Sequence, residues 1–210
     1  MNAIPLRRDV HYPESDGKPM GETEIHIREI IYLFEALDEH LRGVQEVYVG
    51  ADMLLYYVEG NSRQFVVPDV FVTLGVPRGQ RRIYKLWDEG RPPSLIVEVT
   101  SNSTRTEDIS RKKDLYERLG VEEYILYDPL QDYLRPPVQG FRLVKGRYQP
   151  MPTGTDGEVL SLTTGVSLRI EDRGIRAVDT ATGEPSLSNE EVRAELARLR
   201  TENAGLRGDR

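Results

Sequence analysis

The chain has 210 residues, enough for one domain of about 150 to 190 residues with a sizeable core and short appendages. Its formal net charge of −7 and its pI near 5.2 argue against a protein held on nucleic acid by a general positive field, so any such partner must meet a local basic surface. The chain has no cysteine and only three scattered histidines, which excludes thiolate chemistry and disfavours zinc, so a hard cation with oxygen ligands fits better.

The first quarter of the chain predicts an irregular arm followed by a helix. Residues 1–20 are rich in proline, glycine and charge and form the arm. Over residues 22–41 apolar side chains recur at helical spacing and predict one apolar face, and Gly43 ends the helix. The residues of that face are Ile27, Ile30, Phe34, Leu37 and Leu41.

The middle of the chain predicts strands. Three strand-like runs cover residues 44–49, 53–58 and 70–74, separated by glycine-containing turns. A loop rich in proline, glycine and arginine follows over 76–93 and contains the only tryptophan, Trp87. The run at 94–100 is continuously apolar, which is typical of a strand covered on both faces.

Residues 106–127 predict a βαβ unit with the preceding strand. A helix is expected over 106–119, stopped at Gly120, and a strand over 123–127. This order indicates an α/β domain whose sheet has parallel members. Later segments predict short antiparallel strands at the edge of that sheet, at residues 141–144, 159–162, 166–170 and 175–178.

The C-terminal part predicts a linker over 180–187 and a helix over 188–210. Alternating spacings of four and three are typical of a coiled-coil seam with one polar residue at a core position. The seam residues are Val192, Leu196, Leu199, Asn203 and Leu206. Two heptads also fit a frayed, solvated helix, and this alternative stays open. The seam predicts a homodimer or a higher homo-oligomer.

Two acids enter apolar strands. Asp69 follows Pro68 at the start of one strand, and Glu98 is embedded in the most apolar strand, where it shares a face with Ile96 and Thr100. A buried carboxylate needs a cation, a proton or strong donors beside it, and a shared metal ion would satisfy both acids. The structural alternative is that Asp69 caps a turn and Glu98 pairs with an arginine.

Lys112 lies in the middle of the apolar stripe of the predicted helix at 106–119. That stripe is drawn by Ile109, Leu115, Tyr116 and Leu119, whereas Lys113 falls near its edge. An inward lysine is costly unless its ammonium group reaches an anion, so we expect Lys112 to meet the two acids. Asp108, one turn earlier, could orient the amine. The alternative is a Lys112 that extends to solvent and pairs only with Asp108.

An ordered series of these residues resembles the Uma-two family of restriction endonucleases, within the PD-(D/E)XK nuclease superfamily. The resemblance covers about residues 10–179. It rests on Pro68-Asp69, Glu98-Val99-Thr100-Ser101, Asp108 with Lys112, Tyr116, Gly120-Val121-Glu122-Glu123-Tyr124 and Tyr127-Asp128-Pro129.

The resemblance implies a restriction-endonuclease-like fold over 21–179, in which helices flank a mixed β-sheet, and Mg²⁺-assisted hydrolysis of phosphodiesters. It implies that Asp69 and Glu98 bind the metal, with the backbone carbonyl of Val99 as a third ligand, and that Lys112 is the catalytic lysine. The superfamily pattern has a lysine two residues after the glutamate, where this chain has Thr100. The lysine is therefore expected to have moved to the helix.

Two residues of the first helix are weaker candidates. Glu22 matches a helix-borne acid of many such nucleases and could complete the site. His26, one turn later, is expected toward the edge of the apolar face. For both residues, helix capping or packing is the favoured role.

DNA contacts would come from the loop at 76–93 and its surroundings. The basic candidates are Arg78, Arg81, Arg82, Lys85, Arg91, Arg105 and Arg111. Tyr84 and Trp87 are interleaved with them and could pack against sugar or base. A solvated loop with Trp87 in the core is the alternative.

We therefore predict a Mg²⁺-dependent endodeoxyribonuclease, with Mn²⁺ able to substitute. No apolar stretch approaches the roughly 20 residues of a membrane span, and the start lacks a signal-peptide pattern, so a cytoplasmic protein is expected. A catalytically silent nucleic-acid-binding or assembly module of the same fold is the alternative, favoured by Thr100 and the acidic pI. A third hypothesis is that the protein hydrolyses a phosphodiester other than DNA.

Overall fold

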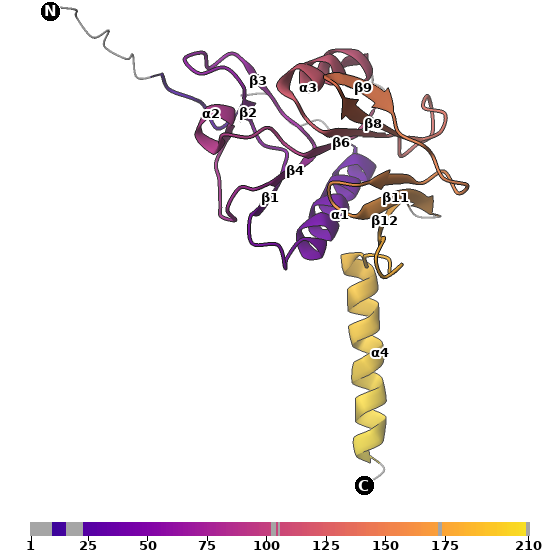
Figure 1. Ribbon diagram of the computed structural model, residues 1–210. Coiled ribbons are helices and arrows are strands. Elements are labelled where there is room, and N and C mark those ends of the chain that lie inside the picture. Colours follow the sequence, from indigo (N-terminus) through magenta and orange to yellow (C-terminus); the bar gives the residue numbers. More distant parts are fainter. Residues whose placement is uncertain (1–9, 16–22, 102–103, 105, 172–173, 209–210) are drawn as a thin grey trace, which may run out of the picture.

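The computed structural model describes residues 10–15, 23–101, 104, 106–171 and 174–208 (Figure 1). Glu22 and Arg105, both named above as candidates, lie outside the described residues. The same holds for most of the N-terminal arm. Within residues 10–15, Tyr12 packs against Tyr56 and Trp87, with ring centroids 5.0 and 5.2 Å apart.

A six-stranded mixed sheet forms the centre of the molecule. Its strands in spatial order are β1 (Val47–Ala51), β4 (Val70–Leu74), β6 (Leu95–Val99), β7 (Glu123–Tyr127), β8 (Val138–Val144) and β9 (Arg147–Pro150). Strands β6 and β7 are parallel, and every other neighbouring pair is antiparallel. The predicted βαβ unit is confirmed, and its two apolar strands lie in the middle of the sheet, buried on both faces.

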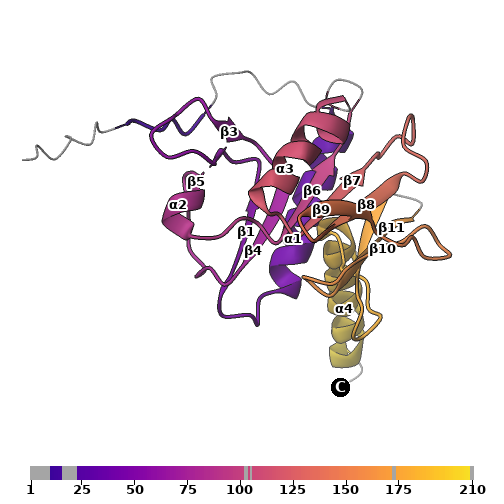
Figure 2. The same cartoon turned by 45° about the horizontal axis from the view of Figure 1, so that its top comes forward.

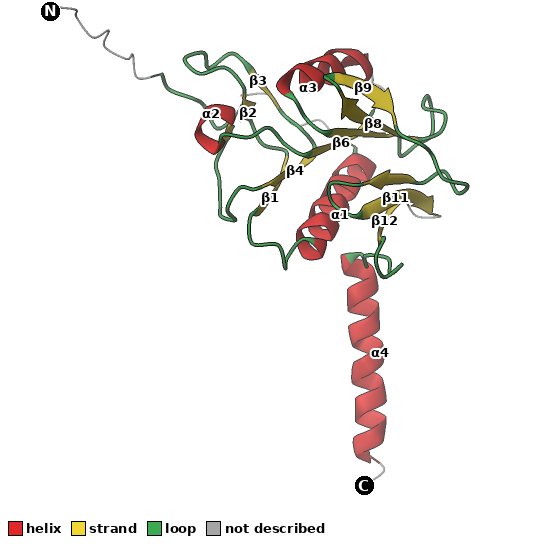
Figure 3. Cartoon of the chain, viewed as in Figure 1, coloured by secondary structure: helices red, strands yellow, loops and turns green. Residues whose placement is uncertain are grey.

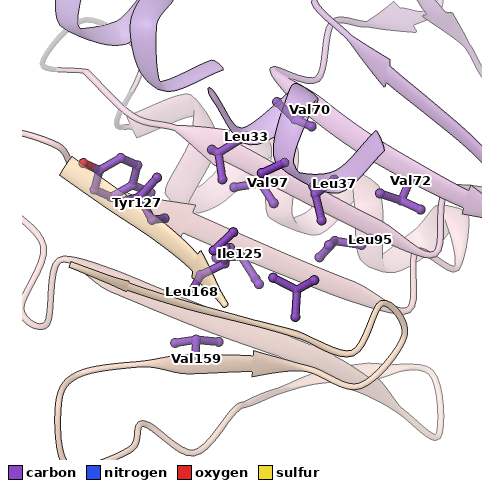
Figure 4. Packing of buried hydrophobic residues seen from close by; sticks show 14 of the residues in the cluster. Leu33, Leu37, Val70, Val72, Leu95, Val97, Ile125, Tyr127, Val159 and Leu168 are labelled. Carbon is purple, nitrogen blue, oxygen red and sulfur yellow. The ribbon is translucent and has the colours of Figure 1, made fainter. Parts of the chain in front are cut away.

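Helix α1 (Glu24–His40) covers one face of the sheet (Figure 2). Figure 4 shows Leu33 and Leu37 of this helix over Val97 and Leu95 of β6. The helix begins after Thr23, whose hydroxyl accepts a hydrogen bond from the backbone N–H of His26.

The buried face of α1 differs from the expected one. Leu37 and Leu41 are buried as predicted, but Ile27 is 44% exposed. The helix instead turns His26, Glu29 and Leu33 inward. Sequence periodicity missed this because two of the inward residues are polar and so do not register on a hydrophobic pattern.

The opposite face of the sheet is covered by a helical segment of two parts. Residues Glu107–Lys112 form a π-helix, and α3 (Lys113–Leu119) continues it to Gly120, which adopts a left-handed conformation with φ of 83°. The sequence predicted one regular α-helix here. The wider π turn changes the register, and Ile109, expected inside, is 43% exposed.

Two smaller sheets complete the domain. Strands β10 (Val159–Ser161), β11 (Val166–Glu171) and β12 (Gly174–Asp179) form an antiparallel sheet that packs beside α1 and β8. The expectation that these segments extend the edge of the central sheet was therefore wrong, since only β8 joins it. The other small sheet contains β3 (Phe65–Val66), β2 (Leu55–Tyr56) and β5 (Tyr84–Lys85), and the short α2 (Leu86–Glu89) follows β5.

Helix α4 (Asn189–Gly208) extends away from the body of the molecule and meets it only at its N-terminal end (Figure 3). No helix among the described residues combines the length and the apolar character needed to cross a bilayer.

Candidate active site

The two predicted acids lie at the ends of adjacent strands. Strand β4 pairs antiparallel with β6 so that Val70 faces Val97, which brings the preceding Asp69 beside the carboxyl end of β6. The Asp69 side chain confirms this placement, because its Oδ2 accepts a hydrogen bond of 2.7 Å from the backbone N–H of Val99. Asp69 is therefore hydrogen-bonded to the backbone of the strand that carries Glu98.

Glu98 is fully buried, and each of its carboxylate oxygens has a donor. Its Oε2 lies 2.8 Å from Nζ of Lys112, and its Oε1 accepts a hydrogen bond of 2.7 Å from the hydroxyl of Tyr116. Strand alternation explains the direction, because Val97 and Val99 face α1 while Ile96 and Glu98 face the helical segment at 107–119. The alternative in which Glu98 pairs with an arginine is not what the structure shows.

Lys112 reaches inward from the end of the π-helix. Its Nζ lies 3.1 Å from Oδ1 of Asp108 as well as 2.8 Å from Glu98, so it pairs with both acids and not with Asp108 alone. Asp108 is itself buried, and its backbone carbonyl accepts a hydrogen bond of 2.9 Å from the hydroxyl of Tyr124. Lys113, by contrast, lies 3.6 Å from the centre of the Phe141 ring.

The electrostatics of the cluster follow from burial and from an excess of acids. Burial raises the pKa of Glu98 well above its usual value, while the nearby ammonium of Lys112 opposes this shift. Burial raises the pKa of Asp108 in the same way, again against Lys112. Burial alone would lower the pKa of Lys112, but Glu98, Asp108 and Asp69 together outweigh it and raise that pKa. Lys112 is therefore a stable cation among three acids.

Two further predicted residues, His26 and Thr100, lie near the cluster. His26 is 3% exposed, and its Nε2 lies 3.6 Å from Oδ2 of Asp69, so the structure brings it to the site instead of the helix edge. Thr100 is buried, and its hydroxyl hydrogen-bonds to that of Tyr133. Thr100 stands directly after the strand, at the usual lysine position. Lys112 reaches Glu98 from the helical segment instead.

Tyr116 is the residue whose contact the sequence reasoning missed. Its position in the apolar stripe was recognised, but no role was given to its hydroxyl. Burial, followed by the charge of Glu98, raises the pKa of Tyr116 well above its usual value, so the group is a neutral donor. Its spacing of four residues from Lys112 was the available signal, because both side chains then lie on one helical face.

The cluster fits a divalent cation in charge but is not a ready-made cage. No group of three or more histidine, aspartate or glutamate side chains among the described residues has the arrangement of a complete metal site. When all groups are ionised, however, Asp69, Glu98 and Asp108 carry two more negative charges than Lys112 offsets. Mg²⁺ commonly uses only one or two protein carboxylates and keeps several waters, so this donor set suits it.

Most of the basic residues proposed for DNA contact already have acidic partners. Arg81 makes two hydrogen bonds to Glu89, at 2.6 and 3.0 Å, and lies over the ring of Tyr48. The other pairs are Arg78 with Asp38, Arg82 with Glu14, Lys85 with Asp88, and Arg111 with Glu107. Arg91 packs over Gly75. Trp87 is half-buried against Tyr12, so the loop is held by internal contacts.

A separate cavity of about 320 Å³ lies at the root of α4, among α1, β11 and β12. Glu29, Tyr32 and Arg176 are among its lining residues. It does not include Asp69, Glu98 or Lys112.

Comparisons with known proteins give the family and the fold of the chain. A crystal structure of a "putative nuclease belonging to DUF820" from Anabaena variabilis ATCC 29413 matches with a TM-score of 0.52 at 14% identity. The match covers 70% of this chain and 76% of that chain, and at this identity it supports the shared fold. No curated protein matches the chain. The family model Uma2, described as "Putative restriction endonuclease", matches residues 2–174. The chain therefore belongs to the Uma2 family, and it shares its mixed α/β fold with that Anabaena variabilis protein.

Proposed function

We propose that the protein is a Mg²⁺-dependent endonuclease that hydrolyses phosphodiester bonds of DNA. The observation that carries the proposal is the convergence of Asp69, Glu98 and Lys112 at the carboxyl end of β6. The family membership and the nuclease fold support the same reaction class.

In this proposal Asp69 and Glu98 hold the cation, with the backbone carbonyl of Val99 as a further ligand. Bound Mg²⁺ would supply Lewis-acid stabilisation of the phosphate and lower the pKa of a coordinated water. Lys112 orients the attacking water or donates a hydrogen bond to a phosphate oxygen, and its raised pKa keeps it positively charged for this role. Asp108 and Tyr116 hold Lys112 and Glu98 in place. His26 holds Asp69, and Thr100 bonds to Tyr133 at the end of the strand that carries Glu98.

A catalytically silent module that binds nucleic acid is the second candidate. The acidic pI favours it, as does Thr100 at the position where the superfamily pattern has lysine. DNA contacts by Arg78, Arg81, Arg82, Lys85 and Arg111 stay a prediction, and each of these residues must release or share an acidic partner to bind phosphate.

The experiment that tests the nuclease proposal removes one site carboxylate at a time. Asp69→Asn and Glu98→Gln should abolish Mg²⁺-dependent cleavage of DNA and weaken Mn²⁺ binding measured by titration calorimetry. Both substitutions conserve shape, and when Glu98 is replaced Lys112 keeps Asp108 as an acidic partner. Cleavage should be measured on plasmid, linear duplex and single-stranded DNA substrates. A small synthetic phosphodiester serves as the control that is not a nucleic acid.

Glu123→Gln is the matched control. Glu123 is also a buried carboxylate, but it lies at the opposite end of the parallel pair, where it binds Arg142 and Ser161. Its substitution should lower stability and leave the cleavage rate of the folded protein unchanged. Equal Mn²⁺ binding by wild type, Asp69→Asn and Glu98→Gln would refute the metal site. DNA binding without cleavage under any divalent cation would support the silent module.

Two other expectations belong with this proposal. We expect a homodimer or a higher homo-oligomer formed through α4, and a cytoplasmic location in which DNA is accessible.

A further inference from the structure

Helix α4 is fixed at its base and otherwise stands clear of the domain. Its first residue, Asn189, donates hydrogen bonds of 2.7 and 2.9 Å to the carboxylate of Glu35 on α1. Glu191, in its first turn, makes two hydrogen bonds of 2.8 Å to Arg176 of β12. The remaining length of this 20-residue helix, about 30 Å in all, projects outward in a set direction (Figure 1).

The projecting helix exposes an apolar stripe. Val192, Leu196 and Leu199 are 39%, 47% and 40% exposed and follow one another at spacings of four and three residues. Asn203 continues the same stripe and, in the single chain, donates a hydrogen bond of 3.0 Å to the carbonyl of Leu199. In heptad terms Leu196 and Asn203 are at a positions, while Val192 and Leu199 are at d positions.

The residues that flank this stripe are segregated by charge. The two g positions are both glutamate, Glu195 and Glu202, and the three e positions are all arginine, Arg193, Arg200 and Arg207. Among the described residues, the ion-pair partner of both glutamates is Arg198 of their own helix. Neither Arg193 nor Arg200 has an acidic partner within ion-pair distance among the residues that the structure describes.

We propose that α4 pairs with α4 of a second copy of this chain as a parallel, two-stranded coiled coil. In a parallel pair each g residue faces the e residue five positions later on the partner helix. Glu195 then faces Arg200 of the second copy. In an antiparallel pair g faces g and e faces e, which opposes glutamate to glutamate and arginine to arginine. The charge pattern therefore selects the parallel orientation.

The polar seam residue supports the same arrangement. A single asparagine at an a position can bond to its counterpart only when the helices are parallel and in register, and such a residue specifies the register and the oligomeric state. Because α4 is anchored at its N-terminal end, a parallel pair holds both nuclease domains at the same end of the stalk. The inference specifies the oligomer expected above and does not depend on nuclease activity.

The first test measures mass and the role of the stripe. Sedimentation equilibrium of the full chain should give two chains per particle in the micromolar range. Leu196→Asp should raise the dimer dissociation constant at least tenfold, because it places a charge in the seam. Ala194→Asp adds the same charge on the outer side of the same helix and should leave the dimer unchanged. A single-chain mass at all concentrations, a four-chain mass, or equal effects of the two substitutions would overturn the proposal.

The second test determines orientation by the sign of an effect. In the parallel pair Arg200→Glu places a glutamate opposite Glu195 of the second copy and should weaken the dimer. In an antiparallel pair that sets Arg200 against Arg193 of the second copy, the same substitution would replace a clash between arginines with an ion pair and strengthen the dimer. Because the chain has no cysteine, Val192→Cys can also be compared with Thr201→Cys on the outer side of the helix. Oxidation should cross-link Val192→Cys much faster. A stronger Arg200→Glu dimer, or equal cross-linking, would overturn the parallel arrangement.

Discussion

Adjacent lysines of the same helical segment have different surroundings. Lys112 lies among Glu98, Asp108 and Asp69, whereas Lys113 rests on the ring of Phe141. If Lys112 stabilises charge on the reacting phosphate, Lys112→Met removes an interaction made in the transition state, worth about 10² to 10³ in rate. Lys113→Met removes only a surface charge and a contact with an aromatic ring, so cleavage should change little.

The comparison is made by single-turnover cleavage at saturating Mg²⁺. Lys112→Met also removes the ammonium beside the buried Glu98 and Asp108 and should be the less stable variant, so the rates are compared per folded protein. A Lys112→Met protein that cleaves as fast as wild type, or a Lys113→Met protein that is the slower of the two, would show that the lysine has been assigned wrongly.

Tyr116 gives a second prediction at this scale. Tyr116→Phe leaves Oε1 of Glu98 without its buried donor, so the carboxylate is less well oriented toward a metal ion. Partners of this kind commonly change metal affinity or activity by about 10- to 100-fold. We expect a loss in that range in Mn²⁺ affinity, measured by calorimetry on the folded protein.

Tyr84→Phe is the control for Tyr116→Phe. Tyr84 is equally buried, but its hydroxyl donates to the backbone carbonyl of Arg91, in another part of the core. Both substitutions should therefore cost similar stability, about 1 kcal/mol for one hydrogen bond, while only Tyr116→Phe weakens metal binding. Equal Mn²⁺ affinities in the two variants would reduce Tyr116 to a packing residue.

At the scale of elements, the sequence predicted extended runs better than helical faces. Strands β4 and β7 agree with the expected residues 70–74 and 123–127, because continuous apolar runs bounded by turns mark buried strands. The face of α1 was misjudged because His26 and Glu29 point inward. The π turn at 107–112 was not predicted either, because its tertiary contacts, Lys112 with Glu98 and the Asp108 carbonyl with Tyr124, are not visible in a local pattern.

The packing of the three-stranded sheet β10–β12 on the central sheet can be tested at Gly140 of β8. A Cβ atom at this position would lie 2.5 Å from Cγ1 of Val159 and 2.7 Å from Sδ of Met151. Gly140→Ala therefore overpacks the junction and should lower the free energy of unfolding by about 1 to 3 kcal/mol. Gly43→Ala, where a Cβ meets nothing within 4 Å, should cost far less. Chemical denaturation of both variants makes the comparison, and similar midpoints would contradict this packing.

At the scale of the whole molecule, local patterns predicted the βαβ unit but not which sheet each later strand joins. Strands β10, β11 and β12 were recognised as strands, but pairing partners are chosen by long-range packing against α1 and β8. The site was predictable for a related reason. Glu98 and Lys112 belong to one βαβ unit, whose handedness and strand alternation bring them together. His26 reaches Asp69 across 43 residues of chain, and no local pattern reports that contact.

The excess of acids at the site should also govern the stability of the whole fold. Burial raises the pKa of Glu98 and of Asp108, so the folded protein keeps protons that the unfolded chain, with ordinary values of 4.5 and 3.8, has released. The free energy of unfolding of the metal-free protein should therefore fall as the pH rises above these values. The pKa of Lys112 is raised above its ordinary 10.5, so its stabilising contribution is fully present throughout this range and does not alter the sign.

A divalent cation that binds the ionised carboxylates should reverse this loss. At a concentration 100 times its dissociation constant, Mn²⁺ would add about 2.7 kcal/mol to the free energy of unfolding. Thermal unfolding should show a larger gain near pH 8 than near pH 5, because protons compete with the metal at the lower pH. In Glu98→Gln both the pH dependence and the gain should shrink, whereas Glu123→Gln should be less stable overall and keep both. If the stability of the metal-free wild type instead rises from about pH 5 to 8, the pKa values of these carboxyl groups are not raised in the folded protein.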